Sequence, residues 1–140
     1  MTISGVLRRF FLAYVVLIIV VAVAFQLLGI ASSSGVNVGI LIGAVLWPCL
    51  AFAEKNGRYF TPAEKKTVVW SMIAINLALQ LVVGGGAMAA EGKFSAGPLL
   101  FALVFVGLIH SVAIYFFVGQ AGKMYVKQQE AKAKKLAKGN

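Results

Sequence analysis

Charged residues are scarce in this sequence, and three long stretches contain none. Only 12% of its 140 residues are charged, whereas a soluble domain carries about 25%. No Lys, Arg, Asp or Glu occurs at residues 10–53, 67–90 or 94–122. Crossing about 30 Å of hydrocarbon takes roughly 20 apolar residues. Each stretch is therefore long enough for at least one membrane-spanning helix, and we expect an integral membrane protein.

The residues that usually build catalytic and metal sites are also few. The sequence has no aspartate, one cysteine (Cys49) and one histidine (His110). A lone histidine cannot complete a nucleophilic triad, and proteolysis by paired aspartates is excluded. One cysteine forms no disulfide within one chain, and too few ligands share any one depth to hold a metal ion. We expect a non-enzymatic protein without a metal or a cofactor.

Four apolar segments predict four membrane-spanning helices, at about residues 10–30, 36–53, 67–88 and 98–118. The first is longer than the 7–15 apolar residues of a cleavable signal peptide, so we interpret it as a span. Short connections make neighbouring helices antiparallel. The predicted fold is an all-α membrane protein, with an antiparallel four-helix transmembrane bundle over residues 1–122. A lysine-rich tail over residues 123–140 extends the last helix.

The distribution of Lys and Arg predicts the orientation of these spans. Positive residues collect in the cytoplasmic segments of membrane proteins. Lys93 lies between the last two spans, and the other twelve of the thirteen Lys and Arg lie before the first span, between the second and third, or in the tail. We expect both termini in the cytoplasm. The tail lysines are interpreted as part of this charge pattern; attraction to anionic lipid, at about 1 kcal/mol for each lysine, is the alternative.

The connection between the second and third spans has the most specific local pattern. An Asn-Gly pair at residues 56–57 predicts a helix end, because glycine tolerates the left-handed conformation there. Thr-Pro-Ala-Glu at residues 61–64 predicts a capping box with proline in the first helical position. We expect a structured inner loop; a docking loop for a cytoplasmic partner is the alternative. Its residues are Gly57, Arg58, Thr61 and Glu64.

Polar residues inside the predicted spans are few and neutral. At 1.5 Å per residue, Asn76 and His110 both lie about 12 Å from the cytoplasmic surface, and Gln80 lies one turn deeper, level with Gly107. An amide or imidazole without a partner in hydrocarbon costs several kcal/mol. We expect Asn76, Gln80 and His110 to form a polar core, with Asn76 meeting His110. Proton transfer through His110 is the alternative, although transporters of protons usually need a carboxylate in the membrane.

Three glycines of the second span are spaced four residues apart. Gly35, Gly39 and Gly43 therefore share one helix face. Faces of small residues let two membrane helices approach closely. We expect this face to pack against another helix, of this chain or of a second copy.

A Ser-Ser-Gly turn precedes the second span, and a Gly-Arg-x-x-Thr-x-x-Glu inner loop (Gly57, Arg58, Thr61, Glu64) follows it. In these features residues 32–76 resemble a family of small, uncharacterised bacterial inner-membrane proteins with four spans. The resemblance implies a bacterial inner membrane and implies no activity. Small multidrug exporters are similar in size, but they carry a glutamate in the first span that this sequence lacks.

Together these observations favour a membrane-embedded binding or accessory protein, of which an immunity protein against a membrane-targeting toxin is one form. An oligomeric small channel or transporter and a packing subunit of a larger complex are the alternatives. The expected partners are the lipid bilayer and either another protein or a second copy. Nucleic acid is not expected, because no aromatic residues alternate with the lysines and no folded module accompanies them.

Single cysteines on a Cys49→Ala background test the predicted orientation. With Ser33→Cys or Ser95→Cys, a membrane-impermeant thiol reagent added to intact cells should label the protein. With Gly139→Cys it should not, because the tail lies in the cytoplasm. Labelling at position 139 in intact cells contradicts the orientation.

Overall fold

The structure, a computed structural model, describes residues 1–29 and 34–138, and its secondary structure there is entirely helical. Its four helices are α1 (Ile3–Leu28), α2 (Ser34–Asn56), α3 (Pro62–Ala90) and α4 (Ala96–Lys138). Each is long and apolar enough to cross a membrane. The predicted all-α chain with four apolar helices is therefore confirmed. The last residue of the first predicted span, Ile30, and residues 31–33 of the turn lie outside the described residues.

The helices begin and end where local chemistry favours it, and they extend beyond the predicted spans. Thr2 caps α1 by accepting a hydrogen bond from the Gly5 amide, so this helix starts at residue 3. Gly29 ends it in the left-handed conformation, with φ of 64°, which costs glycine little. The lysine-rich segment continues α4 to Lys138, giving a helix of 43 residues. This helix is about 65 Å long at 1.5 Å per residue.

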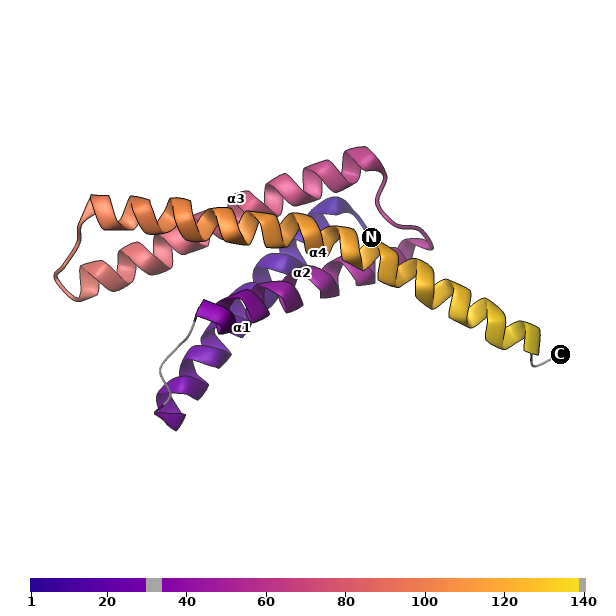
Figure 1. Cartoon of the computed structure of the whole chain (residues 1–140), viewed down its shortest axis with the longest axis horizontal. Helices are drawn as coiled ribbons and strands as arrows, with labels where there is room; N and C mark the ends of the chain where they lie inside the picture. Colours follow the sequence, from indigo (N-terminus) through magenta and orange to yellow (C-terminus); the bar gives the residue numbers. More distant parts are fainter. Residues whose placement is uncertain (30–33, 139–140) are drawn as a thin grey trace.

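The four helices form two hairpins, α1 with α2 and α3 with α4 (Figure 1). The hairpins pack on one another through α2 with α4 and through α1 with α3. They are close together at the end that holds Met1 and residues 57–61, which we call the core end. At the opposite end, the splayed end, the end of α1 and the connection at residues 91–95 lie far apart (Figure 1).

Buried side chains from every helix fill the core end. Phe10, Phe52, Met72 and Ile114 come one from each helix, and each is at most 2% exposed. Burial stops part-way along two helices, at Tyr14 on α1 and at Asn76 on α3. The outer surface is apolar, as at Phe101 (74% exposed) and Leu108 (64% exposed). An exposed apolar surface of this extent is typical of contact with lipid or with another protein.

The connection at residues 57–61 is attached to α4 through Tyr59. The Tyr59 hydroxyl donates a hydrogen bond to the Val118 carbonyl. The Tyr59 ring lies against Gly122, where an added Cβ would approach two ring carbons to 2.8 Å. A Cβ at Gly119, one turn earlier, would come no closer than 3.5 Å to the Lys65 ammonium. Only a glycine at position 122 therefore lets the ring reach α4.

We predict opposite effects for Gly122→Ala and Gly119→Ala. Alanine favours a helix interior over glycine by about 1 kcal/mol, so Gly119→Ala should leave stability unchanged or raise it. Gly122→Ala should lower it, because overpacking typically costs about 1–3 kcal/mol. Thermal unfolding of the purified protein in detergent measures both.

Removing the ring provides the control. On a Tyr59→Ala background, Gly122→Ala should no longer destabilise the protein, because nothing remains for the methyl group to meet. Equal effects of the two glycine substitutions on the wild-type background would show that the Tyr59 contact does not constrain position 122.

Candidate functional site

A cleft of about 250 Å³ lies between the two hairpins, and all four helices line it. Its walls are mostly apolar, with Ile18, Ile40 and Leu103 among them. It extends from Gly84 and Leu99, near the splayed end, to the buried residues Tyr14 and His110. The polar side chains that line it are Tyr14, Asn37, Gln80 and His110.

The cleft exists because the hairpins separate beyond the core. Tyr14 is the last buried residue of α1 and also lines the cleft, so it lies on the boundary between the two. Beyond Tyr14 on α1 and Asn76 on α3, side chains of these two helices are at most partly buried, and α3 continues to pack on α4. The cleft borders the buried core at Tyr14, and the hairpins diverge toward the splayed end (Figure 1).

Gln80 of α3 and His110 of α4 form a hydrogen bond at the cleft. The Gln80 Nε2 and His110 Nδ1 atoms are 2.6 Å apart. When the amide donates, Nδ1 accepts, and the proton of the neutral imidazole is on Nε2. Gly107 lets the helices approach here, since an added Cβ would lie 2.5 Å from the Leu77 Cδ2 atom. The Gly107 contact and the polar pair therefore belong to one close approach of α3 and α4.

Asn76 is fully buried and lies apart from this pair. The described residues give no hydrogen-bond partner to either polar atom of its amide, or to Gln80 Oε1. Asn76 and Gln80 are four residues apart, so they share one face of α3. Asn76 is the residue one turn closer to the core end. Asn76 is not among the residues that line the cleft, and its amide is buried without a partner among the described residues.

The sequence places Asn76 level with His110, but the structure pairs His110 with Gln80. An estimate of depth from 1.5 Å per residue, here called the depth count, treats each side chain as level with its own Cα atom. Side chains of a helix instead tilt toward its N-terminus. In antiparallel helices the two tilts are opposite, so Gln80 reaches back toward the core end and His110 reaches toward the splayed end. The two tilts therefore bring the side chains of Gln80 and His110 together, although the depth count puts their Cα atoms at different depths.

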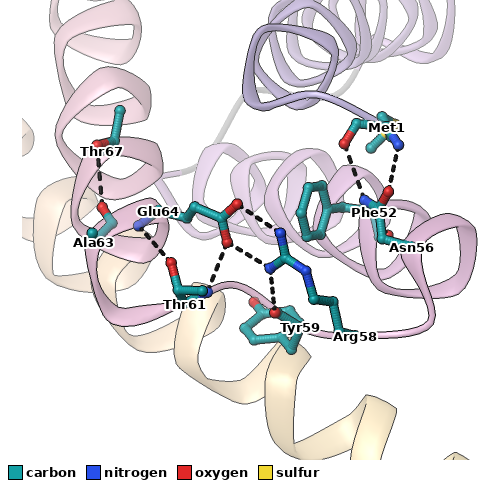
Figure 2. A network of polar contacts seen from close by, with 9 residues as sticks. All are labelled: Met1, Phe52, Asn56, Arg58, Tyr59, Thr61, Ala63, Glu64 and Thr67. Carbon is teal, nitrogen blue, oxygen red and sulfur yellow. Dashed lines mark hydrogen bonds and ion pairs between the residues drawn. The ribbon is translucent and has the colours of Figure 1, made fainter.

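The inner-loop residues lie at the core end and hold one another (Figure 2). Arg58 donates to both carboxylate oxygens of Glu64, at 2.7 and 2.9 Å. The Thr61 amide donates to Glu64 at 2.8 Å, and Thr61 accepts from the Glu64 amide, which completes the capping box. Gly57 has the left-handed conformation, with φ of 65°. These polar groups bond to one another and so stabilise the conformation of the loop.

The charge of Glu64 follows from these bonds. The Arg58 hydrogen bonds and then the Thr61 amide lower the pKa of the Glu64 carboxyl from 4.5 to about 2. A carboxyl whose pKa is lower in the folded protein stabilises the fold at pH values above its pKa in the unfolded chain. This stabilisation is lost as pH falls from about 4.5 toward 2. Since the ion pair is exposed to solvent, its contribution is small. The carboxylate stays ionised at neutral pH, and the loop keeps its shape there.

The glycine face of α2 is exposed and does not pack closely on another described helix. Gly35, Gly39 and Gly43 are all exposed. An added Cβ at Gly39 meets nothing within 4 Å among the described residues, and at Gly43 it meets only Leu17, at 3.9 Å. Close packing of this face on another helix is not found within the described chain. Packing on a second copy stays a prediction.

Two cleft residues, Tyr14 and Asn37, are not identified as site residues by the sequence. Tyr14 follows a pair of arginines and has the position of an aromatic residue at a membrane surface. Asn37 falls at the edge of a predicted span. In the structure α2 begins at Ser34, so Asn37 is in the first turn of the helix. The only signal available is an asparagine in an otherwise apolar helix. Within residues 1–29 and 34–138, no cluster of His, Cys and Glu could hold a metal ion.

The Gln80–His110 pair predicts a measurable coupling between the two positions. We expect Gln80→Leu and His110→Leu each to lower the unfolding free energy while the fold is retained. A double-mutant cycle in bicelles should give a coupling near the average of about 0.6 kcal/mol for such bonds in membranes, and below about 1.7 kcal/mol. Gln26→Leu is the control, because Gln26 is exposed on α1. Gln26→Leu and His110→Leu should be additive; additivity of Gln80→Leu with His110→Leu would contradict the pairing.

Comparisons of the chain with family models, with curated proteins and with solved structures found no match.

Proposed function

We propose that this protein is a non-enzymatic, four-span protein of the bacterial inner membrane that binds a small neutral amphiphile in the cleft between its hairpins. In this proposal the four helices form an antiparallel transmembrane bundle with both termini in the cytoplasm. The observation that carries it is the apolar cleft lined by all four helices, with the Gln80–His110 pair in its wall. Ligand sites in proteins are typically concave and mostly apolar, with a few polar groups that orient the ligand.

The chemistry of the lining favours an uncharged ligand. None of the described residues that line the cleft is Lys, Arg or Glu. A charged group bound there would lose its hydration without gaining a counter-ion, which is costly. Tyr14, Asn37 and His110 together supply both donors and acceptors of hydrogen bonds. A hydroxyl group, which also donates and accepts, fits this lining.

The size of the cleft limits the length of the ligand. An apolar cavity of about 150 Å³ is large enough to hold benzene. In proportion, the 250 Å³ of this cleft accommodates an apolar group of roughly ten carbon atoms. An α-helix with its side chains is about 10 Å across and does not fit unless the hairpins move apart. The cleft therefore favours a small molecule over a partner's transmembrane helix.

Charge supports the proposed orientation. Lys93 is near the splayed end, and the other twelve of the thirteen Lys and Arg belong to segments at the core end or to the extension of α4. With the core end in the cytoplasm, the pattern agrees with the positive-inside rule. The resemblance of residues 32–76 to small bacterial inner-membrane proteins supports the bacterial location. In this orientation the cleft opens toward the opposite side of the membrane.

A small channel or transporter is the second candidate. The polar residues Asn37, Gln80 and Asn76 follow one another from the splayed end toward the core, and the Asn76 amide has no partner among the described residues. Such a series favours entry of water or of a polar solute. The purified protein in liposomes distinguishes the candidates, since a transporter produces flux by itself. An immunity protein or a packing subunit would instead retain a specific protein partner during purification.

A photoreactive alcohol tests the proposed ligand class. The purified protein in lipid nanodiscs is irradiated with a diazirine-bearing decanol, and the labelled residues are mapped by mass spectrometry. We expect saturable labelling near Ile40 and Leu103, with unlabelled decanol competing. Leu103→Trp should abolish this labelling, because the indole ring fills the cleft.

Leu108→Trp is the matched control. Leu108 is on the same helix but is 64% exposed on the outer surface, so its replacement should leave the labelling of the cleft unchanged. Labelling spread evenly over the apolar surface, or unaffected by Leu103→Trp, would contradict a ligand site in the cleft.

A further inference from the structure

A second hollow lies on the outer surface where α3 and α4 pack together, near the core end. Its volume is about 290 Å³, and it is lined by Lys66, Val69, Trp70 and Ile73 of α3 and by Tyr115 of α4. We call it the groove. The α3 residues are spaced at i, i+3, i+4 and i+7, so they form one continuous stripe of the helix surface. The groove is separate from the cleft and shares no residue with it.

Two exposed aromatic side chains belong to the groove. Trp70 is 65% exposed and Tyr115 is 64% exposed, whereas Val69 is only 6% exposed. Val69 therefore contributes the floor and the two rings contribute the sides. Tryptophan and tyrosine are enriched at the level of the lipid headgroups, where one part of the side chain is apolar and the other meets water. The groove has the composition expected at that level of a membrane.

Two positive charges lie at the core end of the groove. Lys66 lines it, and the Lys65 ammonium lies 5.5 Å from the centre of the Tyr115 ring. The ion pairs among the described residues are Arg58 with Glu64 and Lys93 with Glu91, so neither lysine has a carboxylate partner there. The adjacent Glu64 is occupied by Arg58. The groove therefore carries uncompensated positive charge.

The groove changes from polar to apolar along α3. Ile73 is seven residues beyond Lys66, which is about 10 Å along the helix at 1.5 Å per residue. Moving from the core end, the order is Lys66, then Val69 and Trp70 beside Tyr115, then Ile73. A phospholipid has the same order from its phosphate through its glycerol backbone to its acyl chains.

We propose that the groove binds an anionic phospholipid of the cytoplasmic leaflet. Lys65 and Lys66 hold the phosphate, and one acyl chain lies over Val69 and Ile73 between Trp70 and Tyr115. Basic pockets beside membrane helices on the cytoplasmic side are suited to anionic headgroups. The inference rests on the membrane orientation in the proposed function and is independent of any ligand in the cleft.

Native mass spectrometry of the full chain in detergent, with phosphatidylglycerol or phosphatidylcholine added, measures this binding. We expect the wild-type protein to retain one phosphatidylglycerol molecule in preference to phosphatidylcholine. A lysine near an anionic surface contributes about 1 kcal/mol, so Lys65→Gln or Lys66→Gln should weaken binding about fivefold, and both together about 25-fold.

The tail provides a control of equal charge. Lys134→Gln with Lys135→Gln removes two positive charges from the exposed part of α4 and should not change the preference. Trp70→Leu with Tyr115→Leu should weaken binding without any change of charge.

Three outcomes overturn the inference: no preference in the wild type, loss of the preference in the tail variant alone, or full retention in the variant that lacks both groove lysines. Failure of the protein to enter the membrane fraction would instead contradict the proposed function. Failure of decanol labelling in the cleft would leave the groove unaffected.

Discussion

Residues 57–61 close the core end, and the two sites depend on that closure. Tyr59 bonds to the Val118 carbonyl and lies on Gly122, while Arg58 and Glu64 fix the shape of the loop before it enters α3. This contact helps to hold the α1–α2 hairpin against α4 at the core end. The hairpins separate toward the other end, and the cleft occupies the space between them. At the closed end, the same start of α3 brings Lys66 and Trp70 beside Tyr115 to form the groove.

The two sites differ in charge because they lie at different depths. The cleft is deep in the apolar part of the helices, where an unpaired charge is costly, and its polar lining consists of amides, an imidazole and a phenol. The groove begins beside the first turn of α3, where lysines can remain hydrated. In the two proposals, the depth of each site therefore selects its ligand chemistry, uncharged in the cleft and anionic in the groove.

Local features could be predicted from the sequence, and contacts between hairpins could not. Charge-free stretches identify four apolar helices, and Thr61 with Glu64 identifies the start of α3. A depth count alone brings Asn76, Gln80 and His110 to one region, but the direction in which side chains tilt decides that His110 pairs with Gln80. The docking of Tyr59 on Gly122 joins residues far apart in the chain, and no local pattern specifies it. The cleft lies between the hairpins, so its shape depends on contacts between helices that are far apart in the chain.

The unbroken α4 connects the cleft mechanically to the far tip of the chain. Its contact with the core is centred near Val118, about 28 Å from Leu99 in one direction and about 30 Å from Lys138 in the other at 1.5 Å per residue. The parts of the helix on the two sides of this contact are therefore nearly equal in length. If the helix pivots as a rigid rod, a 3 Å outward swing at the cleft, an illustrative amplitude of roughly 6° of tilt, gives an opposite swing of similar size at the tip. A change in the width of the cleft would therefore be transmitted along α4 to the opposite end.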